Sequence, residues 1–110
     1  MRTSSLAAIA LLLGGVPAQA SGDGAAGKAI AESQCKQCHG VDGQRLTEDA
    51  PNLSGQNRKY MRIQLFQFRS GERPSDVMTD VASRLSDQDI FDVAEWYGSV
   101  GVEVRLPADQ

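Results

Sequence analysis

Both cysteines and the only histidine of this chain lie within five consecutive positions. Cys35 and Cys38 are three residues apart, and His39 follows directly. On a helix or a helical turn, residues i and i+3 face the same way, so both sulfurs reach the same object. The imidazole of His39 points in another direction and meets a different part of that object. These residue types at this spacing are therefore suited to hold one large group at several points.

A haem group meets this requirement. Its two vinyl groups accept the two thiols as thioethers, its iron accepts the imidazole, and C-x-x-C-H is the attachment pattern of c-type haem. The sequence therefore predicts that Cys35 and Cys38 hold one haem c covalently and that His39 binds its iron.

Three other uses of the cysteine pair fit the sequence less well. A structural zinc site needs four ligands, and the chain has no second cysteine pair or second histidine to complete it. A thioredoxin-like redox pair is expected in a βαβ context, whereas the flanking residues have helical periodicity. A disulfide between Cys35 and Cys38 would close a very small loop and would add little stability.

Residues 1–20 have the features of a signal peptide that is cleaved on export. Arg2 supplies a positive charge, residues 6–16 form an apolar run of eleven residues, and the AQA sequence at 18–20 offers a small-x-small cleavage site. The run is too short to cross a membrane, which takes about 20 apolar residues. The mature chain is therefore expected to be residues 21–110, in the periplasm.

The composition of the mature chain excludes several classes of function. Without Arg2 it has ten basic against fourteen acidic side chains, a net charge of −4, which argues against a general nucleic-acid binder. No later stretch is long and apolar enough to span a membrane. Ninety residues form one domain, and a domain of this size buries little surface by itself, so a cofactor would help to complete its core.

Three stretches have the periodicity of helices, and these must position the cysteines and the histidine. The first is expected from about Asp23 to Lys36, and Asp23 can cap it. The second is expected from about Gln56 to Ser70, and Gly71 ends it. The third begins at Ser86, where a capping box places a carboxylate in the first turn.

Long loops are expected between these helices. Turn-forming residues mark 40–55 and 71–85 as loops, and an alternating strand pattern appears only weakly in 100–107. Long loops in a small domain usually wrap a ligand or carry function. The sequence thus predicts an all-α domain of three to four helices wrapped with long loops around one haem, with its core at about residues 24–99 and a short C-terminal tail, 100–110.

The opposite face of the iron needs a second ligand. Methionine is the soft donor that remains, and residues 21–110 contain Met61 and Met78. Met61 lies on the apolar face of the expected second helix, beside Leu65, which suits a core residue. Met78 lies in the expected loop before the third helix, from which a flexible thioether can swing over the haem. Position therefore favours Met78 over Met61.

Four segments together carry a resemblance to a known family: GKAIAESQCKQCHG, APNLSGQ, YMRIQLFQFRSGER and VMTDVASRLSDQDIFDVAEWYGS. In this order and spacing the chain resembles the class I c-type cytochromes. More narrowly, it is similar to the small bacterial periplasmic cytochromes of the c-four type, which are often two such domains in tandem. The similarity covers nearly all of residues 24–99. Because only one C-x-x-C-H is present, one haem per chain is expected.

The resemblance assigns roles to individual positions. It implies that Cys35 and Cys38 form the thioethers and that His39 and Met78 are the axial ligands of the iron. It further implies that the carbonyl of Pro51 accepts the Nδ1–H of the ligand histidine, which fixes the tautomer of the ring.

Five more positions match recurrent ones near the haem of this family. Leu53 would pack on the haem, and the others are Gln56, Tyr60, Arg69 and Arg73. The haem propionates are the partners that the resemblance offers to Arg69 and Arg73. The alternative is that these two arginines belong to a solvated stripe that also contains Arg58 and Arg62.

Two strong axial ligands leave the iron with no open position for a substrate. Such a site is suited to outer-sphere transfer of one electron, and methionine opposite histidine raises the reduction potential relative to two histidines. The chain is therefore expected to be an electron carrier and no enzyme. Its partners would be membrane-bound or soluble oxidoreductases met in small, transient contacts, by a monomer or a weak dimer.

Two other functions stay open on the sequence. The domain can be the haem subunit of a larger oxidoreductase complex, such as a flavin-containing sulfide dehydrogenase, whose haem domains resemble this sequence. It can also be a haem-based sensor in which Met78 leaves the iron.

Overall fold

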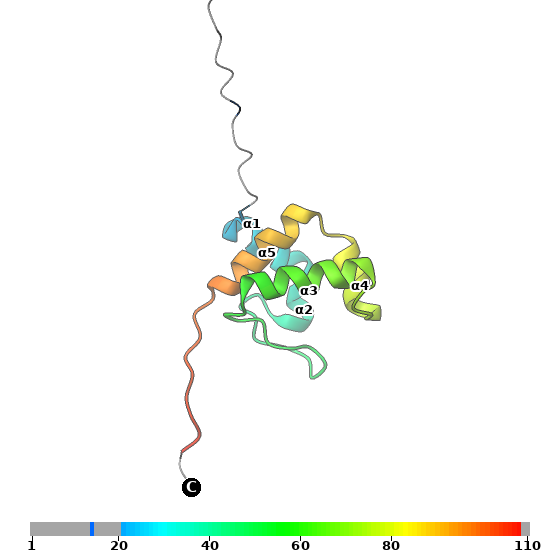
Figure 1. Cartoon of the computed structure of the whole chain (residues 1–110). Coiled ribbons are helices and arrows are strands. Elements are labelled where there is room, and N and C mark those ends of the chain that lie inside the picture. Colours follow the sequence, from blue (N-terminus) through cyan, green and yellow to red (C-terminus); the bar gives the residue numbers. More distant parts are fainter. Residues whose placement is uncertain (1–13, 15–20, 109–110) are drawn as a thin grey trace, which may run out of the picture.

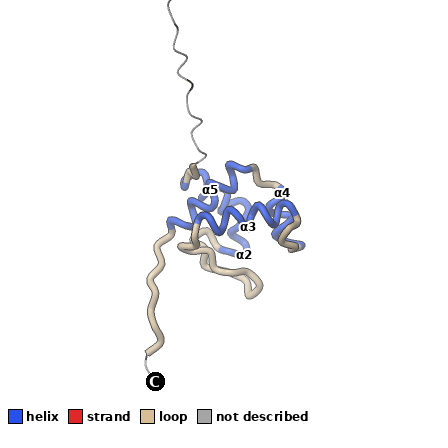
Figure 2. Tube along the Cα trace, in the orientation of Figure 1, coloured by secondary structure: helices blue, strands red, loops and turns tan. Residues whose placement is uncertain are grey.

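The computed structural model describes residue 14 and residues 21–108, so the expected signal peptide lies almost wholly outside the described residues. The elements are α1 (Gly24–Ile30), η1 (Ala31–Cys35), α2 (Lys36–His39), α3 (Arg58–Ser70), α4 (Asp76–Ser83) and α5 (Asp87–Ser99). Among residues 21–108 there is no β-strand (Figure 2). The predicted all-α class is confirmed. Within the same residues, no helix has the length and apolar character needed to cross a membrane.

The first three elements form one continuous helical segment that ends at His39. Asp23 caps it as expected, because its carboxylate accepts the backbone amide of Ala25 at 2.9 Å. The middle element, η1, is a π-helical turn in which the amide of Lys36 donates to the carbonyl of Ala31. The segment stops at Gly40, whose φ of 71° and ψ of 158° are open essentially to glycine alone. The chain therefore turns away sharply just after His39.

Helices α1 and α5 cross at very short distance because the crossing point on α1 is a glycine. A Cβ on Gly27 would lie 1.9 Å from the carbonyl oxygen of Asp92 and 2.9 Å from the Cβ of Trp96. The buried carboxylate of Asp92 accepts the amide of Asp23 at 2.8 Å and the side-chain amide of Gln88 at 2.8 Å. The hydrogen bond from Asp23 ties the start of α1 to α5, whereas the one from Gln88 lies within α5.

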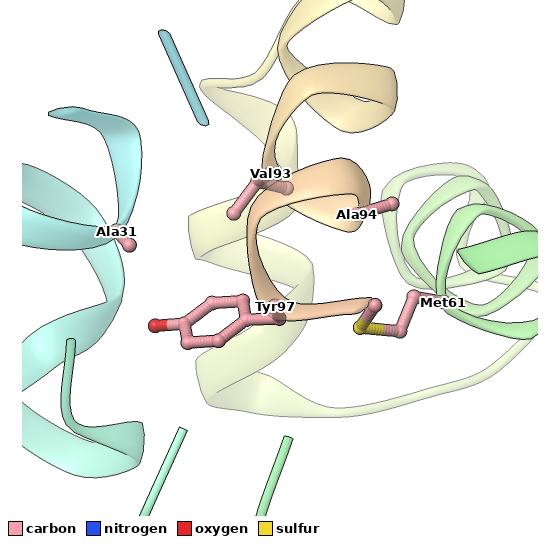
Figure 3. Close-up of a cluster of buried hydrophobic side chains, with 5 residues drawn as sticks. All are labelled: Ala31, Met61, Val93, Ala94 and Tyr97. Carbon is pink, nitrogen blue, oxygen red and sulfur yellow. The ribbon is translucent and has the colours of Figure 1, made fainter. Parts of the chain in front are cut away.

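Helix α3 packs on α5 from another side and closes a small core. The two helices are joined by an ion pair between Arg58 and Glu95 at 2.8 Å and by an edge-to-face contact of Phe66 and Phe91 at 6.4 Å. Figure 3 shows the buried side chains at the centre, drawn from the helical segment α1–η1, from α3 and from α5: Ala31, Met61, Val93, Ala94 and Tyr97. Helix α5 is therefore the element on which the others assemble.

Two parts of the chain differ from the sequence prediction. Residues 71–85 were expected to be a loop, but they contain α4, and Ser75 caps this helix by accepting the amide of Met78 at 3.1 Å. Gly71 and Pro74 do break the chain as expected, yet the helix begins only two residues after the proline. The weak alternating pattern of residues 100–107 forms no strand in the described chain. This tail runs away from the helices (Figure 1) and is exposed from residue 101 onward.

Candidate functional site

A cavity of about 470 Å³ lies at the centre of the described fold. Its walls come from η1 and α2, from the loop of residues 40–57, from α3, from the segment around Pro74, and from α4 and α5. Apolar side chains cover much of the wall: Leu53, Met61, Leu65, Phe68, Val81, Leu85 and Val93. A cavity of this size and lining is typical of a binding site for a cofactor.

His39 lies at the end of α2, lines this cavity and is only 8% exposed. Its Nδ1 is 2.9 Å from the carbonyl oxygen of Pro51. A carbonyl can only accept, so Nδ1 carries a proton, and in this tautomer Nε2 is the nitrogen left to bind a metal. The same hydrogen bond fixes the plane of the ring and raises its basicity. The imidazole is thereby held in one orientation at the cavity.

The two cysteines form no disulfide, and both are half-buried. Cys35 lines the cavity, whereas Cys38, one helical turn further on, lies outside the lining residues. Burial raises the pKa of the Cys35 thiol to about 11, although a hydrogen bond with Tyr97 lowers it in part. Cys35 is therefore protonated at neutral pH and a weaker nucleophile than an exposed thiol.

The two methionines both reach the cavity but from different settings. Met61 is 7% exposed and lies in the core beside α5 (Figure 3). Met78 is half-buried and lies in the first turn of α4. The prediction that Met78 belongs to a loop is wrong, because Ser75 starts a helix there. Met78 thus reaches the cavity from a backbone that is already fixed.

Pro51, Leu53, Gln56 and Tyr60 all line the cavity. Leu53 is half-buried and packs against the core cluster. Tyr60 is 48% exposed, which places it where the cavity opens to solvent. The loop of residues 40–57 and the start of α3 therefore meet at the cavity as the sequence suggested.

The structure separates the two arginines that were expected to act as a pair. Arg73 lines the cavity, and its guanidinium lies 2.6 Å from Oε1 of Gln64 and 4.5 Å from the ring centre of Phe68. Arg69 lies outside the lining and donates to the carbonyl of Leu85 at 2.9 Å. It also pairs with Asp87. Arg69 thus joins α3 to the start of α5, and only Arg73 is placed beside the cavity.

One wall residue that the sequence did not assign to the site is Tyr97. It is 1% exposed, lines the cavity, and its hydroxyl donates to the carbonyl of Gly40 at 2.8 Å. The helical periodicity of Ile90, Val93 and Ala94 already placed Tyr97 on the buried face of α5. No pattern along the chain links it to Gly40, which is 57 residues away.

The side chains around the cavity fit a c-type haem. One imidazole with Nδ1 already bonded, two methionine thioethers and one cysteine sulfur line the same space, and the second cysteine sulfur lies one turn away. Apolar walls suit the ring, and Arg73 offers a cation beside Gln64. Among the described residues, no three or more His, Cys, Asp or Glu side chains gather as they would around a bare metal ion.

The sequence is similar to those of known cytochromes. Residues 24–100 match the family model described as cytochrome c. The chain is 42% identical over 82 residues to cytochrome c-554(548) of Halomonas halodenitrificans, covering 72% of this chain and 98% of that protein. It is 39% identical over 89 residues to cytochrome c4 of Pseudomonas aeruginosa, covering 81% of this chain and 44% of that protein.

A solved structure supports the same relation. Reduced recombinant cytochrome c4 from Pseudomonas stutzeri superposes with a TM-score of 0.65 at 34% identity, covering 76% of this chain and 48% of that chain. The chain thus spans about half the length of the c4 relatives it matches. A cytochrome subunit of sulfide dehydrogenase from Chlorobaculum tepidum is 31% identical over 71 residues, 64% of each chain.

Proposed function

Because this chain belongs to the cytochrome c family and carries the covalently bound haem c of that family, we propose that it is a one-electron carrier of the periplasm. The haem supplies an iron that cycles between the ferrous and ferric states. The carrier is not an enzyme in itself and exchanges electrons with other redox proteins. It works as a monomer or a weak dimer, after cleavage of residues 1–20.

In this proposal several residues at or beside the cavity have a defined role in holding the haem. Cys35 and Cys38 would hold the haem as thioethers, and His39 and Met78 would be the ligands of its iron. The carbonyl of Pro51 keeps the imidazole in one tautomer and one plane, since it lies 2.9 Å from Nδ1. Two firm ligands exclude substrates from the iron, so the electron is all that is exchanged.

The surroundings favour the reduced state. Apolar walls disfavour the additional positive charge of ferric iron, and methionine opposite histidine acts in the same direction. Arg73 is placed to pair with a propionate, because its guanidinium lines the cavity beside Gln64. Tyr60, which is 48% exposed, marks where partners approach the ring.

The observation that carries the proposal is that Cys35, His39 and Met78 line one cavity, with Nδ1 of His39 already bonded. The test is an absorption spectrum and a redox titration of the purified, exported protein. We expect the spectrum of a haem with two thioether links and a single one-electron transition. A spectrum without thioether-linked haem would contradict the proposal.

The assignment of the second ligand has its own test. Because Met78 lies on α4 at the cavity and Met61 is buried in the core, Met78→Ala should abolish the methionine–iron charge-transfer band of the ferric protein. Met61→Leu is the matched variant and should keep the band while lowering stability. Loss of the band in Met61→Leu alone would give the ligand role to Met61.

A second candidate is a haem subunit that serves one fixed enzyme. Its support is the similarity to the cytochrome subunit of sulfide dehydrogenase. Electron transfer would be unchanged, but the partner would stay bound. Co-purification of this chain with a flavoprotein in a fixed ratio would favour the subunit, and isolation of the chain by itself would favour the free carrier.

A further inference from the structure

Two neighbouring aromatic residues in the last turns of α5 donate hydrogen bonds to two successive carbonyls just after His39. The hydroxyl of Tyr97 lies 2.8 Å from the carbonyl oxygen of Gly40, and Nε1 of Trp96 lies 2.7 Å from that of Val41. In Figure 3 the Tyr97 ring extends from α5 toward the helical segment that carries Ala31. The turn that follows His39 is thus held from a distant helix.

The same end of α5 also holds the far end of the loop of residues 40–57. The amide of Gly55 donates to the carbonyl of Tyr97 at 2.9 Å. A Cβ on Gly98 would lie only 3.1 Å from the carbonyl oxygen of Gln56, so the chains touch closely there. Pro51, which accepts from His39, lies between these two attachment points. The end of α5 therefore holds both the turn that follows His39 and the loop that carries Pro51, whose carbonyl accepts from His39.

The carbonyl of Gly40 depends strongly on Tyr97. Its other donor is the amide of Gly43 at 3.4 Å, which is a long and weak hydrogen bond. Gly40 is itself buried and has a backbone conformation of limited population. A buried carbonyl that loses its main donor is costly and is free to rotate. This peptide group joins Gly40 to Val41, so its rotation would disturb the turn that directly follows His39.

We propose that Trp96 and Tyr97 are positioning residues for the His39 ligand. Their two hydrogen bonds fix the turn at Gly40 and Val41, and this fixes the direction in which the imidazole meets the iron. The inference rests on the proposed function, in which His39 binds the haem iron. It adds that the geometry of the ligand is set by α5 as well as by Pro51.

The experiment removes each donor and keeps its ring. Tyr97→Phe and Trp96→Phe both leave an aromatic side chain in place, so packing is largely retained. Ser99→Ala is the hydrogen-bond control, since Ser99 Oγ bonds only within α5, to the carbonyl of Trp96 at 2.6 Å. Phe66→Leu is the stability control, because it weakens the contact of α3 with α5 away from this turn.

Two measurements on the haem-loaded proteins report on position. The first is the set of hyperfine-shifted proton resonances of the His39 ring in the ferric protein. The second is hydrogen exchange of the amides of Gly43 and Leu46, which donate to the carbonyls of Gly40 and Cys38. We expect both donor variants to shift the His39 resonances and to speed exchange at these amides about fivefold, as expected for one lost hydrogen bond. The amide of Thr79 in α4, which donates to the carbonyl of Ser75 at 2.9 Å, is the internal reference.

The outcomes separate the inference from the function. If Tyr97→Phe and Trp96→Phe lose stability as Phe66→Leu does but keep the His39 resonances and the exchange rates, the two residues only stabilise the fold and the inference is overturned. Each variant removes one donor, so a single variant that folds is enough to decide whether the inference holds. If the unaltered protein shows no His39 resonances of an iron ligand, the proposed function itself fails and the inference fails with it.

Discussion

At the scale of the single residue, Gly40 determines how the chain leaves the helix that carries His39. Its φ of 71° and ψ of 158° are strained for any other residue. A Cβ there would also lie 2.4 Å from the carbonyl oxygen of Gln44. A side chain at this position would therefore disturb both the turn and the loop that folds back over it.

We expect Gly40→Ala to lower the free energy of unfolding by about 1–3 kcal/mol through backbone strain, with a further cost from the contact with Gln44. Urea unfolding of the haem-loaded protein, followed by circular dichroism, measures this. Gly71→Ala is the control, because Gly71 has a φ of 79° but open space around it. Its loss should be about 1 kcal/mol. Equal losses in the two variants would show that the contact with Gln44 relaxes without cost.

Tyr97 makes the stability of the protein depend on alkaline pH. Burial raises the pKa of Tyr97 well above its ordinary value of 10.0, and the nearby Asp42 acts in the same direction. The folded state therefore keeps this proton where the unfolded state releases it. The stability that this one proton contributes is fully present below pH 10 and is lost as the pH rises above it. Tyr97→Phe should be less stable at neutral pH and should show a flatter decline from pH 10 to 11.5 in urea unfolding. Parallel curves for the two proteins would contradict this assignment.

Ligand chemistry explains how much of the site could be predicted from the sequence. The spacing of Cys35, Cys38 and His39 predicted their roles, and position favoured Met78 over Met61 as the second soft donor; these roles stay predictions. Backbone acceptors carry no such signal, since any residue has a carbonyl. The bonds of Trp96 and Tyr97 to the turn after His39 therefore became visible only once α5 was placed in space.

At the scale of the element, the helices were predictable where apolar residues recur with helical spacing, as in α3 and α5. The capping box at Ser86 is present, with the amide of Asp89 at 3.0 Å from Oγ of Ser86 and the return bond at 2.9 Å. Helix α4 escaped prediction because it is short and follows directly on Gly71 and Pro74, although Ser75 caps it and its apolar residues recur at helical spacing. Its position depends on packing against α3, which a local pattern does not contain.

The two arginines at the end of α3 should differ in what their loss changes. Arg69→Gln should lower the free energy of unfolding by about 1 kcal/mol, because it breaks the bonds to Leu85 and Asp87 that join α3 to α5. It should leave the reduction potential unchanged. Arg73→Gln should shift the potential, because Arg73 lines the cavity, and should change stability less. Redox titration and urea unfolding of both variants decide; an equal shift of potential in both would place Arg69 beside the propionates too.

At the scale of the whole molecule, the described core is too small to organise the chain by itself. Residues 21–108 contain nine buried apolar side chains, four of them alanine. Only four of the nine line the cavity of about 470 Å³: Met61, Leu85, Val93 and Tyr97. The loop of residues 40–57 hangs below the helices and is held mostly by hydrogen bonds to its own backbone and to α5 (Figure 1). The haem is thus the largest apolar part of the core.

The chain without haem should be poorly folded for this reason. We expect Cys35→Ala/Cys38→Ala, produced without haem, to lose most of its helical far-ultraviolet circular dichroism, since the bound group stabilises only the folded state. Each single cysteine variant, which can still bind haem through His39, is the matched control. Native-like helicity with cooperative unfolding in the double variant would show that the polypeptide core is sufficient.

The π-helical turn at Ala31–Cys35 changes the direction in which the residues after it face. A π turn holds one residue more than an α turn, so the residues after it are rotated by about 100° relative to an unbroken helix. Upstream of the turn, the rotational phase is set by Gly27, which must face α5. Downstream, it is set by the cavity, which Cys35 and His39 must face. Because of the π turn, one helical segment directs Gly27 toward α5 and also directs Cys35 and His39 toward the cavity. A regular helix would meet only one of these two requirements.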